Sequence, residues 1–137
     1  MSSNYFTMNS TSYLVMRVAI GMSAFGHGVV RLFKLNGFSR GMVATFQKSY
    51  IPEALVVPFS YVLPFAELIV GLLLLIGLFT REAAIAGAVI MILLIFGSTS
   101  IENWDAIPTQ LIHIVFLVVV LQFLPSNRYS VDRRLKK

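Results

Sequence analysis

The chain has 137 residues, of which 57% are apolar and only 12% are charged, and its mean hydropathy is +0.81. Soluble domains carry about twice that share of charged residues, so the composition excludes an ordinary soluble domain and indicates an integral membrane protein. The absence of cysteine excludes thiol redox chemistry, iron–sulfur ligation and disulfide bonds. The net charge of +5 does not indicate nucleic-acid binding, because five of the eleven basic residues lie in 128–137, directly after an apolar run.

Four apolar runs are long enough to be membrane spans, since a span needs roughly 20 residues. They cover residues 13–33, 57–79, 83–100 and 107–124, and a basic tail, 125–137, follows the last of them. The runs are continuously apolar, whereas the strands of a membrane β-barrel alternate between apolar and polar residues. The sequence therefore predicts a single all-α membrane domain, a four-helix bundle with up-down-up-down topology.

The longest connection, residues 34–56, contains a helical pattern of its own. Phe38, Met42 and Phe46 recur at every fourth position, which predicts a short amphipathic helix at the outer interface. We expect Pro52 to end this helix. The helix is either a lid over the mouth of the bundle or a linker that lies against the lipid, and the pattern does not distinguish the two.

Two prolines occur in the first half of the second apolar run. Pro58 is predicted to lie at the start of the helix, where its missing N–H has no intrahelical partner to lose. Pro64 removes a backbone hydrogen bond and is predicted to bend the helix just before Glu67. Such a bend would open space beside the carboxylate.

The basic residues predict how the chain is oriented in the membrane. Four spans place both termini on one side, and that side carries six basic residues against three on the other. The six are Arg81, Arg128, Arg133, Arg134, Lys136 and Lys137, and the three are Lys34, Arg40 and Lys48. Because basic residues favour the cytoplasmic side, both termini are predicted to be cytoplasmic.

Four ionisable side chains interrupt the apolar runs: Arg17, His27, Glu67 and His113. A charged group in hydrocarbon costs several kcal/mol unless it is paired, protonated or hydrated. A helix rise of ~1.5 Å per residue places both histidines ~9 Å below the outer boundary and Glu67 ~15 Å below it, close to the midplane. The two histidines are therefore predicted to share one level, with the carboxylate about one turn deeper. Arg17 is predicted to lie nearer the cytoplasmic side.

Polar and small residues share one face on three of the predicted spans. These faces comprise Arg17, Gly21, Ala24, Gly28 and Arg31 on the first span, Ser60, Pro64, Glu67 and Gly71 on the second, and Thr109, Gln110 and His113 on the fourth. Polar faces in a membrane bundle turn inward. We therefore predict a polar pocket, open toward the outer leaflet, lined by His27, Arg31, Glu67, Gln110 and His113.

Each ionisable residue also has a structural interpretation. Arg31 and Lys34 can extend their charged ends to the outer interface, and Arg17 can do the same toward the inner one. His113 can be a hydrogen-bond donor to another helix. Glu67 can belong to a purely structural pair with an arginine or a histidine, although no interface lies within reach of an acid at the midplane.

The predicted pocket is compatible with three kinds of function. The first is a quinone or quinol site, because a histidine and a carboxylate in an apolar cavity suit proton delivery to carbonyl oxygens. The second is haem b held between His27 and His113, whose depths match, although Arg31 lies one turn from His27. The third is a non-enzymatic role as an assembly subunit or small-solute carrier. The sequence has no phosphate loop, no nucleophile constellation and no H-x-x-x-H spacing, so no metal site is predicted.

A set of short motifs extends over most of residues 13–124. It comprises Arg17 and Gly21, His27-Gly28, Lys34, Pro64-Phe65-Ala66-Glu67, Gly71 and Gly77-Leu78-Phe79-Thr80-Arg81. In this pattern the chain resembles the DoxX family of small four-helix membrane proteins, and the E-x-x-x-G…G-x-x-T-R segment is its most specific part. The fourth span is the least diagnostic.

The resemblance implies a four-helix bundle in the bacterial inner membrane. It also implies a subunit of a larger complex, since the namesakes of the family resemble small subunits of a thiosulfate–quinone oxidoreductase and other members are tied to oxidative-stress complexes. Motif positions of the family correspond to Arg17, His27, Lys34, Glu67 and Arg81. The resemblance assigns none of these residues a catalytic role.

Residues and resemblance together lead to the hypothesis of a membrane subunit that handles quinone. In this hypothesis Glu67 and His27 are the catalytic groups that manage protons, His113 and Gln110 orient the head group, and Arg17 and Arg31 set the charge of the cavity. The expected partners are membrane lipid and either other subunits or further copies of the chain, and not nucleic acid.

Overall fold

The computed structural model describes residues 7–137, in which every regular element is helical. The long helices are α1 (Ser10–Phe33), α3 (Glu53–Ile76), α4 (Thr80–Ser100) and α5 (Ile107–Gln122). The short elements are α2 (Leu35–Phe46), α6 (Val131–Leu135) and two 3₁₀ turns, η1 (Trp104–Ala106) and η2 (Leu124–Ser126). Four segments are long and apolar enough to cross a membrane, the last being α5 together with η1. The predicted four-helix membrane bundle is confirmed.

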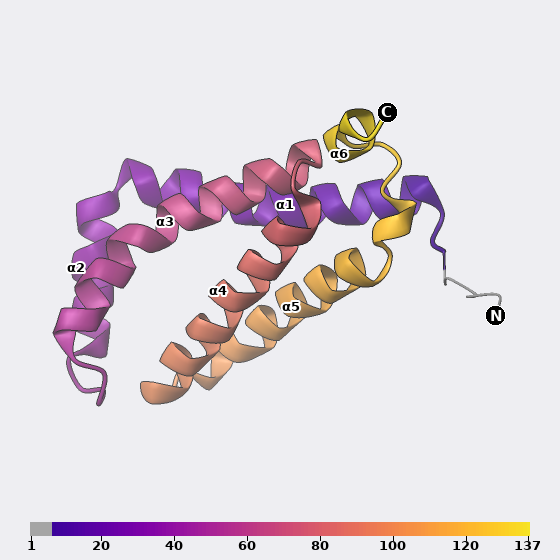
Figure 1. The fold of residues 1–137 in the computed structure, drawn as a ribbon. Coiled ribbons are helices and arrows are strands. Elements are labelled where there is room, and N and C mark those ends of the chain that lie inside the picture. The colour runs from indigo at the N-terminus through magenta and orange to yellow at the C-terminus, as the bar shows by residue number, and fades with distance from the viewer. Residues whose placement is uncertain (1–6) are drawn as a thin grey trace.

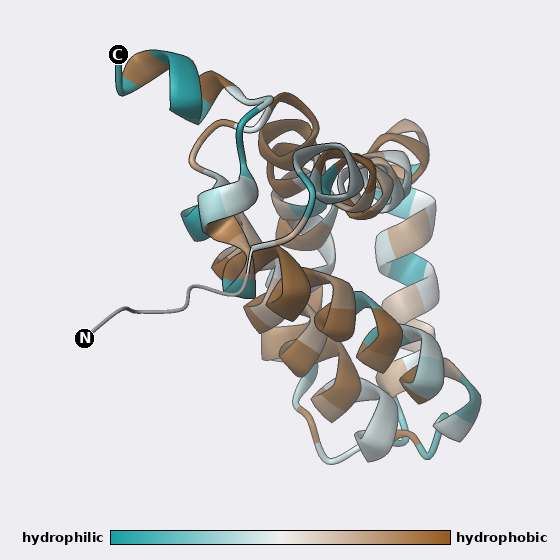
Figure 2. Ribbon diagram, turned by 90° about the vertical axis from the view of Figure 1, so that its right-hand side faces the viewer, coloured by the Kyte–Doolittle hydropathy of each residue, from teal (hydrophilic) through white to brown (hydrophobic). Residues whose placement is uncertain are grey.

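The long helices form two pairs, α1 with α3 and α4 with α5. The pairs converge at the end of the molecule where both termini lie, and they diverge toward the opposite end, where α2 lies (Figure 1). Hydrophobic residues dominate the long helices, whereas hydrophilic residues concentrate on α6 and in the connections (Figure 2). The divergence leaves room between α2 and the α4–α5 pair, and the candidate site lies at this end.

Glycines allow α1 and α3 to approach each other closely. A Cβ atom added to Gly28 would lie 2.5 Å from the backbone nitrogen of Leu68, and one added to Gly71 would collide with the backbone of Phe25. Small residues at such positions let membrane helices pack backbone to backbone. Arg31 follows Gly28 by three residues and Glu67 precedes Gly71 by four, so each shares the contact face of its helix. The close contact therefore brings these two side chains together.

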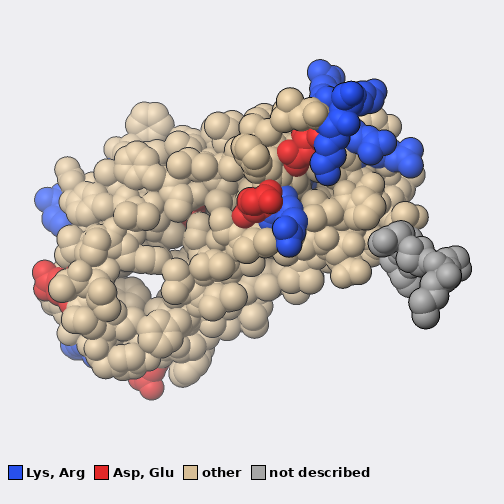
Figure 3. Space-filling model, viewed as in Figure 1, with Lys and Arg blue, Asp and Glu red and all other residues tan. Residues whose placement is uncertain are grey.

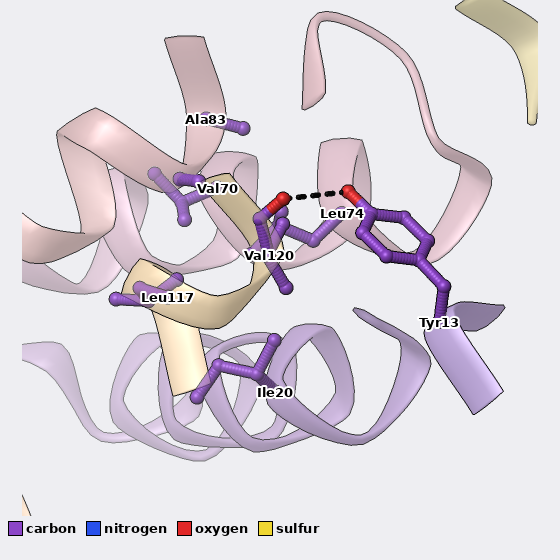
Figure 4. Packing of buried hydrophobic residues seen from close by; sticks show 8 residues of the cluster. Tyr13, Ile20, Val70, Leu74, Ala83, Leu117 and Val120 are labelled. Atoms are coloured by element: carbon purple, nitrogen blue, oxygen red, sulfur yellow. Dashed lines mark hydrogen bonds between the residues drawn. The ribbon is translucent and has the colours of Figure 1, made fainter. Parts of the chain in front are cut away.

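The buried core lies where the two pairs converge. It contains residues of all four long helices: Tyr13, Ile20, Val70, Leu74, Ala83, Ala84, Leu117 and Val120. Figure 4 shows these side chains directed toward one another, with the Tyr13 hydroxyl donating a hydrogen bond to the backbone carbonyl of Val120 at 2.9 Å. That carbonyl belongs to the last turn of α5, where the helix itself supplies no donor. The bond ties the start of α1 to the end of α5.

Two predicted boundaries are wrong. The amphipathic helix forms, but α2 ends at Phe46, six residues before Pro52, and Pro52 is the N-cap of α3. The chain resumes its helix at Glu53, whose carboxylate favours a helix N-terminus, so Pro58 lies inside α3 and not at its start. Pro64 also lies inside α3, and the bend expected there stays a prediction.

Candidate functional site

Glu67 forms an ion pair with Arg31. The Nη1 atom of Arg31 donates to both carboxylate oxygens at 2.6 Å, and the side chains of Glu67 and Arg31 are 4% and 24% exposed respectively. The guanidinium also lies over the ring of Phe38 from α2, 4.9 Å from the ring centroid, where the negative face of the ring attracts the cation. Glu67 therefore has a partner on α1, and α2 covers that partner.

His27 and His113 lie side by side, which agrees with their equal predicted depth. Their ring centroids are 6.3 Å apart and the rings meet edge to face at 79°. The Nδ1 atom of His27 is 2.7 Å from the carbonyl of Ser23, and that of His113 is 2.7 Å from the carbonyl of Thr109. A carbonyl only accepts, so each Nδ1 carries a proton and donates. In the neutral rings each Nε2 is then an acceptor. The Nε2 atom of His113 accepts a hydrogen bond from the Ser23 hydroxyl at 2.8 Å.

These hydrogen bonds do not fit a haem held between the two histidines. A bis-histidine haem needs one free ring nitrogen from each ligand. Both nitrogens of His113 are engaged, Nδ1 with Thr109 and Nε2 with the hydroxyl of Ser23. Ser23 also lies on α1, one turn before His27, so α1 and α5 are in direct contact at this level. In this structure the histidine pair is therefore a contact between two helices, and its hydrogen bonds do not fit a haem held by both rings.

A cavity of about 510 Å³ lies between α2 and the α4–α5 pair. Its walls are largely apolar and include Phe38, Met42 and Phe46 of α2, Phe59 of α3 and Leu93 of α4. The surface is hollowed at this end of the molecule (Figure 3). The volume falls within the ~300–1,000 Å³ typical of small-molecule sites. The apolar residues that predicted α2 thus line a cavity, which is the geometry of a lid.

Gln110 and Ser98 give this cavity a polar point. The Nε2 atom of Gln110 donates to the Ser98 hydroxyl oxygen at 2.9 Å, and both residues line the cavity. The amide oxygen of Gln110 is buried and receives no hydrogen bond within residues 7–137. A buried acceptor without a donor costs about 1–3 kcal/mol. Gln110 thus has a buried acceptor without a donor, next to the Ser98 hydroxyl.

The structure does not bring the five residues predicted to line one pocket to a single cavity. Gln110 lines the cavity between α2 and the α4–α5 pair. Arg31 does not, but its guanidinium contacts the ring of Phe38, which is part of the cavity wall. Glu67 and His113 instead border a separate void of about 20 Å³ in the core. His27 packs against His113 on the exposed side.

The sequence matches the DoxX family over residues 12–99. That match covers more than half of the chain and includes α2, α3 and nearly all of α1 and α4. The chain belongs to the DoxX family. Searches among curated proteins and among solved structures found no match. In this DoxX protein the ion pair and Phe38 lie inside the matched range, whereas Gln110 and His113 lie beyond it.

Arg17 lies far from the cavity of this DoxX protein. It precedes Arg31 by 14 residues on α1, which corresponds to ~21 Å along the helix axis. Its side chain is buried, and the guanidinium donates to the side-chain oxygen of Asn127 and, at 3.0 Å, to the carbonyl of Tyr129. The structure thus does not bring Arg17 to the predicted pocket, and its hydrogen bonds join α1 to the C-terminal segment.

The G-x-x-T-R motif of this DoxX protein lies in the same region. Gly77 has φ +71°, and a Cβ atom there would lie 2.7 Å from Nη1 of Arg17, so the turn needs glycine for both conformation and space. The Thr80 hydroxyl accepts from the side chain of Asn127 at 3.1 Å. The motif is thus the docking point for the chain after α5.

Asp132 is a structural residue that sequence reasoning missed. Its carboxylate accepts from the backbone N–H of Phe79 at 2.7 Å and of Thr80 at 2.9 Å, and so caps α4 from 52 residues away. Its pKa is raised by burial but lowered more by these bonds, by the side chain of Thr80 and by Lys136, so it lies below the ordinary value of 3.8. No local pattern could have revealed this cap, because the partner is remote in sequence.

We expect the Asp132→Asn variant to lose about 1 kcal/mol of stability near neutral pH, the usual worth of an N-cap. Because the folded pKa lies below 3.8, the contribution is complete well above that value and is lost as the pH falls through the folded pKa. Thermal unfolding in detergent between about pH 7 and pH 3 measures this, and the two proteins should converge in acid. Asp105→Asn, at the other end of the molecule, is the control and should match wild type throughout.

Proposed function

We propose that this DoxX protein binds a quinone or quinol head group in the cavity between α2 and the α4–α5 pair, as a subunit of a bacterial inner-membrane complex with both termini in the cytoplasm. The observation that carries the proposal is the buried amide oxygen of Gln110, which has no donor within residues 7–137 and whose side chain, with the Ser98 hydroxyl, belongs to a largely apolar cavity. A hydroxyl group on a flat apolar ring, as in a quinol, supplies the hydrogen-bond donor that this oxygen lacks. The partner subunit is implied by the family resemblance.

The side chains of Gln110 and Ser98 can form hydrogen bonds with both the quinol and the quinone form of such a ring. A quinol hydroxyl can donate to the amide oxygen of Gln110, and the Ser98 hydroxyl, which accepts from Gln110, can donate to a quinone carbonyl. Lys34 also lines the cavity and provides a cation that attracts a carbonyl oxygen. When bound, the quinone supplies two-electron, two-proton redox chemistry.

A second cavity offers room for an isoprenoid tail. It measures about 140 Å³, shares Met42, Phe46 and Phe59 with the first, and has only apolar and glycine residues in its lining. Leu55 and Phe96, which also line it, are 61% and 52% exposed. In a membrane these side chains face lipid, so the smaller cavity leads from the head-group site toward the bilayer.

The ion pair and the histidines take different parts in the proposal. Both oxygens of Glu67 are bound by Arg31, so Glu67 holds the guanidinium against Phe38 and shapes the cavity wall. His27 remains the proposed proton carrier, because only its Nδ1 is hydrogen bonded within residues 7–137 and its Nε2 is left to take up a proton. His113 positions His27 through its edge-to-face contact.

Filling the cavity tests the proposal. Gly41 of α2 lines the cavity, and a Cβ atom there would meet nothing within 4 Å. Leucine is also a better helix former than glycine, by up to about 1 kcal/mol. We therefore expect Gly41→Leu to fold normally and to bind ubiquinone in nanodiscs at least about tenfold more weakly, a loss of ~1.4 kcal/mol. Quinone retained after purification, measured by organic extraction and mass spectrometry, should fall in parallel.

Gly26→Leu is the matched control. Gly26 also lies in a helix with nothing within 4 Å of an added Cβ, but it does not line the cavity, so its variant should bind like wild type. Gln110→Leu should weaken binding without filling the cavity, because it removes the free acceptor. Equal binding by Gly41→Leu and wild type, or no quinone binding by wild type, would refute the proposed site.

A further inference from the structure

Another large cavity lies at the end of the bundle where both termini lie, and its lining is basic. It measures about 550 Å³ and lies between the α3–α4 turn, the end of α5 and α6. Arg81, Arg133 and Lys136 line it, together with the apolar side chains of Phe79 and Leu135. Figure 3 shows the Lys and Arg side chains gathered over this end of the molecule. Three cations thus surround one hollow, beside exposed apolar groups.

The cavity carries three cations and two acids, so the acids offset the positive charge only in part. Glu82 and Asp132 also line it, but both carboxylate oxygens of Asp132 are taken by backbone N–H groups at the start of α4. Within residues 7–137 the only ion pair is that of Arg31 with Glu67, so none of the three cations is paired with an acid. The lining thus has one more cation than acids, and among the described residues none of its cations is held in an ion pair that an anionic ligand would have to break.

The position of the cavity at the end of the membrane-spanning helices indicates which class of anion it can bind. It lies where α4 begins at Thr80 and where α5 ends at Gln122, which is the boundary of the membrane-spanning segments. Phe79 and Leu135 are 59% and 71% exposed. A small anion would meet only the cations and leave these apolar side chains uncovered. A membrane lipid with an anionic head group and acyl chains would engage both sets.

We propose that this cavity, formed by the α3–α4 turn and α6, binds the phosphate head group of an anionic phospholipid through Arg81, Arg133 and Lys136. Basic pockets at the ends of membrane helices are suited to such head groups, and each cation near the surface strengthens the attraction. The hydrogen bonds of Asp132 and Asn127 hold α6, with Arg133 and the following Lys136, against the start of α4, which carries Arg81. The fold of the C-terminal segment thereby builds the site.

The test compares three ligands on the full-length protein in detergent: phosphatidylglycerol, phosphatidylcholine and inorganic phosphate. Native mass spectrometry gives the affinity for each lipid, and thermal shift gives the effect of all three. We expect phosphatidylglycerol to bind at least about tenfold more tightly than phosphatidylcholine. The Arg81→Gln, Arg133→Gln, Lys136→Gln triple variant should lose this preference.

A second triple variant, Arg40→Gln, Lys48→Gln, Lys137→Gln, removes the same charge from residues that do not line the cavity, and it should keep the preference. An equal loss in both variants would show that net charge acts, without a site. An unchanged preference in the first variant would also overturn the proposal, as would stabilisation by inorganic phosphate equal to that by phosphatidylglycerol. Should the first variant fail to fold, Arg133→Gln alone is compared with Arg128→Gln in the same way.

Discussion

Replacing Arg31 with methionine is expected to destabilise the protein by about 3–5 kcal/mol, because it leaves the Glu67 carboxylate buried without a partner. The carboxylate is 4% exposed and lies in a membrane-spanning helix, so neither water nor the interface can solvate it. The measurement is equilibrium unfolding of the purified variant, by heat or by denaturing detergent. A loss of this size would remove much of the stability of a typical small protein.

Two further variants separate the charge effect from a packing effect. The double variant Arg31→Met, Glu67→Leu removes both charges and should recover most of the lost stability, since a buried ion pair is often replaceable by apolar residues. Lys34→Met is the matched control, because Lys34 is a basic residue near the same end of α1 and forms no ion pair within residues 7–137. If Arg31→Met and Lys34→Met have the same stability, the burial of the Glu67 carboxylate does not depend on the ion pair with Arg31.

The sequence predicted the membrane architecture well because long apolar runs leave few alternatives. In a bilayer every backbone polar group must be satisfied inside the segment, so each run becomes a helix. The equal depth of His27 and His113 also followed from counting residues, since the helix rise is constant. These features depend only on the position of each residue along its helix, so they can be predicted without knowing how the helices pack.

The choice of partner for Glu67 could not be decided from the sequence. The sequence left both an arginine and a histidine as possible partners, and the way α1 packs against α3 decides for Arg31. That packing is set by the close contact of Gly28 and Gly71 with the opposite backbone. The glycines were visible as part of a polar and small face, but their role as the contact itself became clear only in three dimensions.

The C-terminal segment is the largest feature beyond prediction. The sequence predicts only a basic tail for residues 125–137, whereas the structure folds them back onto the α3–α4 turn through Asn127 and Asp132. These contacts join residues 47 to 110 positions apart, and no periodic pattern encodes such a distance. For the same reason the sequence associates Arg17 with the pocket, although its burial depends on this segment at the other end of the molecule.

The stability of that fold-back depends on Arg17. Its guanidinium donates to the buried side chain of Asn127 and to the carbonyl of Tyr129. We expect Arg17→Met to cost about 2–3 kcal/mol, because both oxygens lose their donor and a buried acceptor without one costs about 1–3 kcal/mol. The Nε atom of Arg17 has no acceptor within residues 7–137, and the loss of this unpaired donor offsets part of the cost. Arg17→Lys should be intermediate, since an ammonium cannot reach two oxygens with the same fork.

Limited trypsin digestion is the sharpest readout, since the C-terminal segment has basic residues from Arg128 to Lys137 at which the protease can cleave. If Arg17 holds α6 in place, the methionine variant should lose this segment faster than wild type, while cleavage at Arg40 and Lys48, at the far end, stays unchanged. Equal acceleration at both ends would indicate general unfolding, and unchanged cleavage after Arg128 would mean that Asn127 and Asp132 hold the segment alone. A local effect would show that the family's arginine and its G-x-x-T-R turn form one structural unit, separate from the chemistry at the opposite end of the bundle.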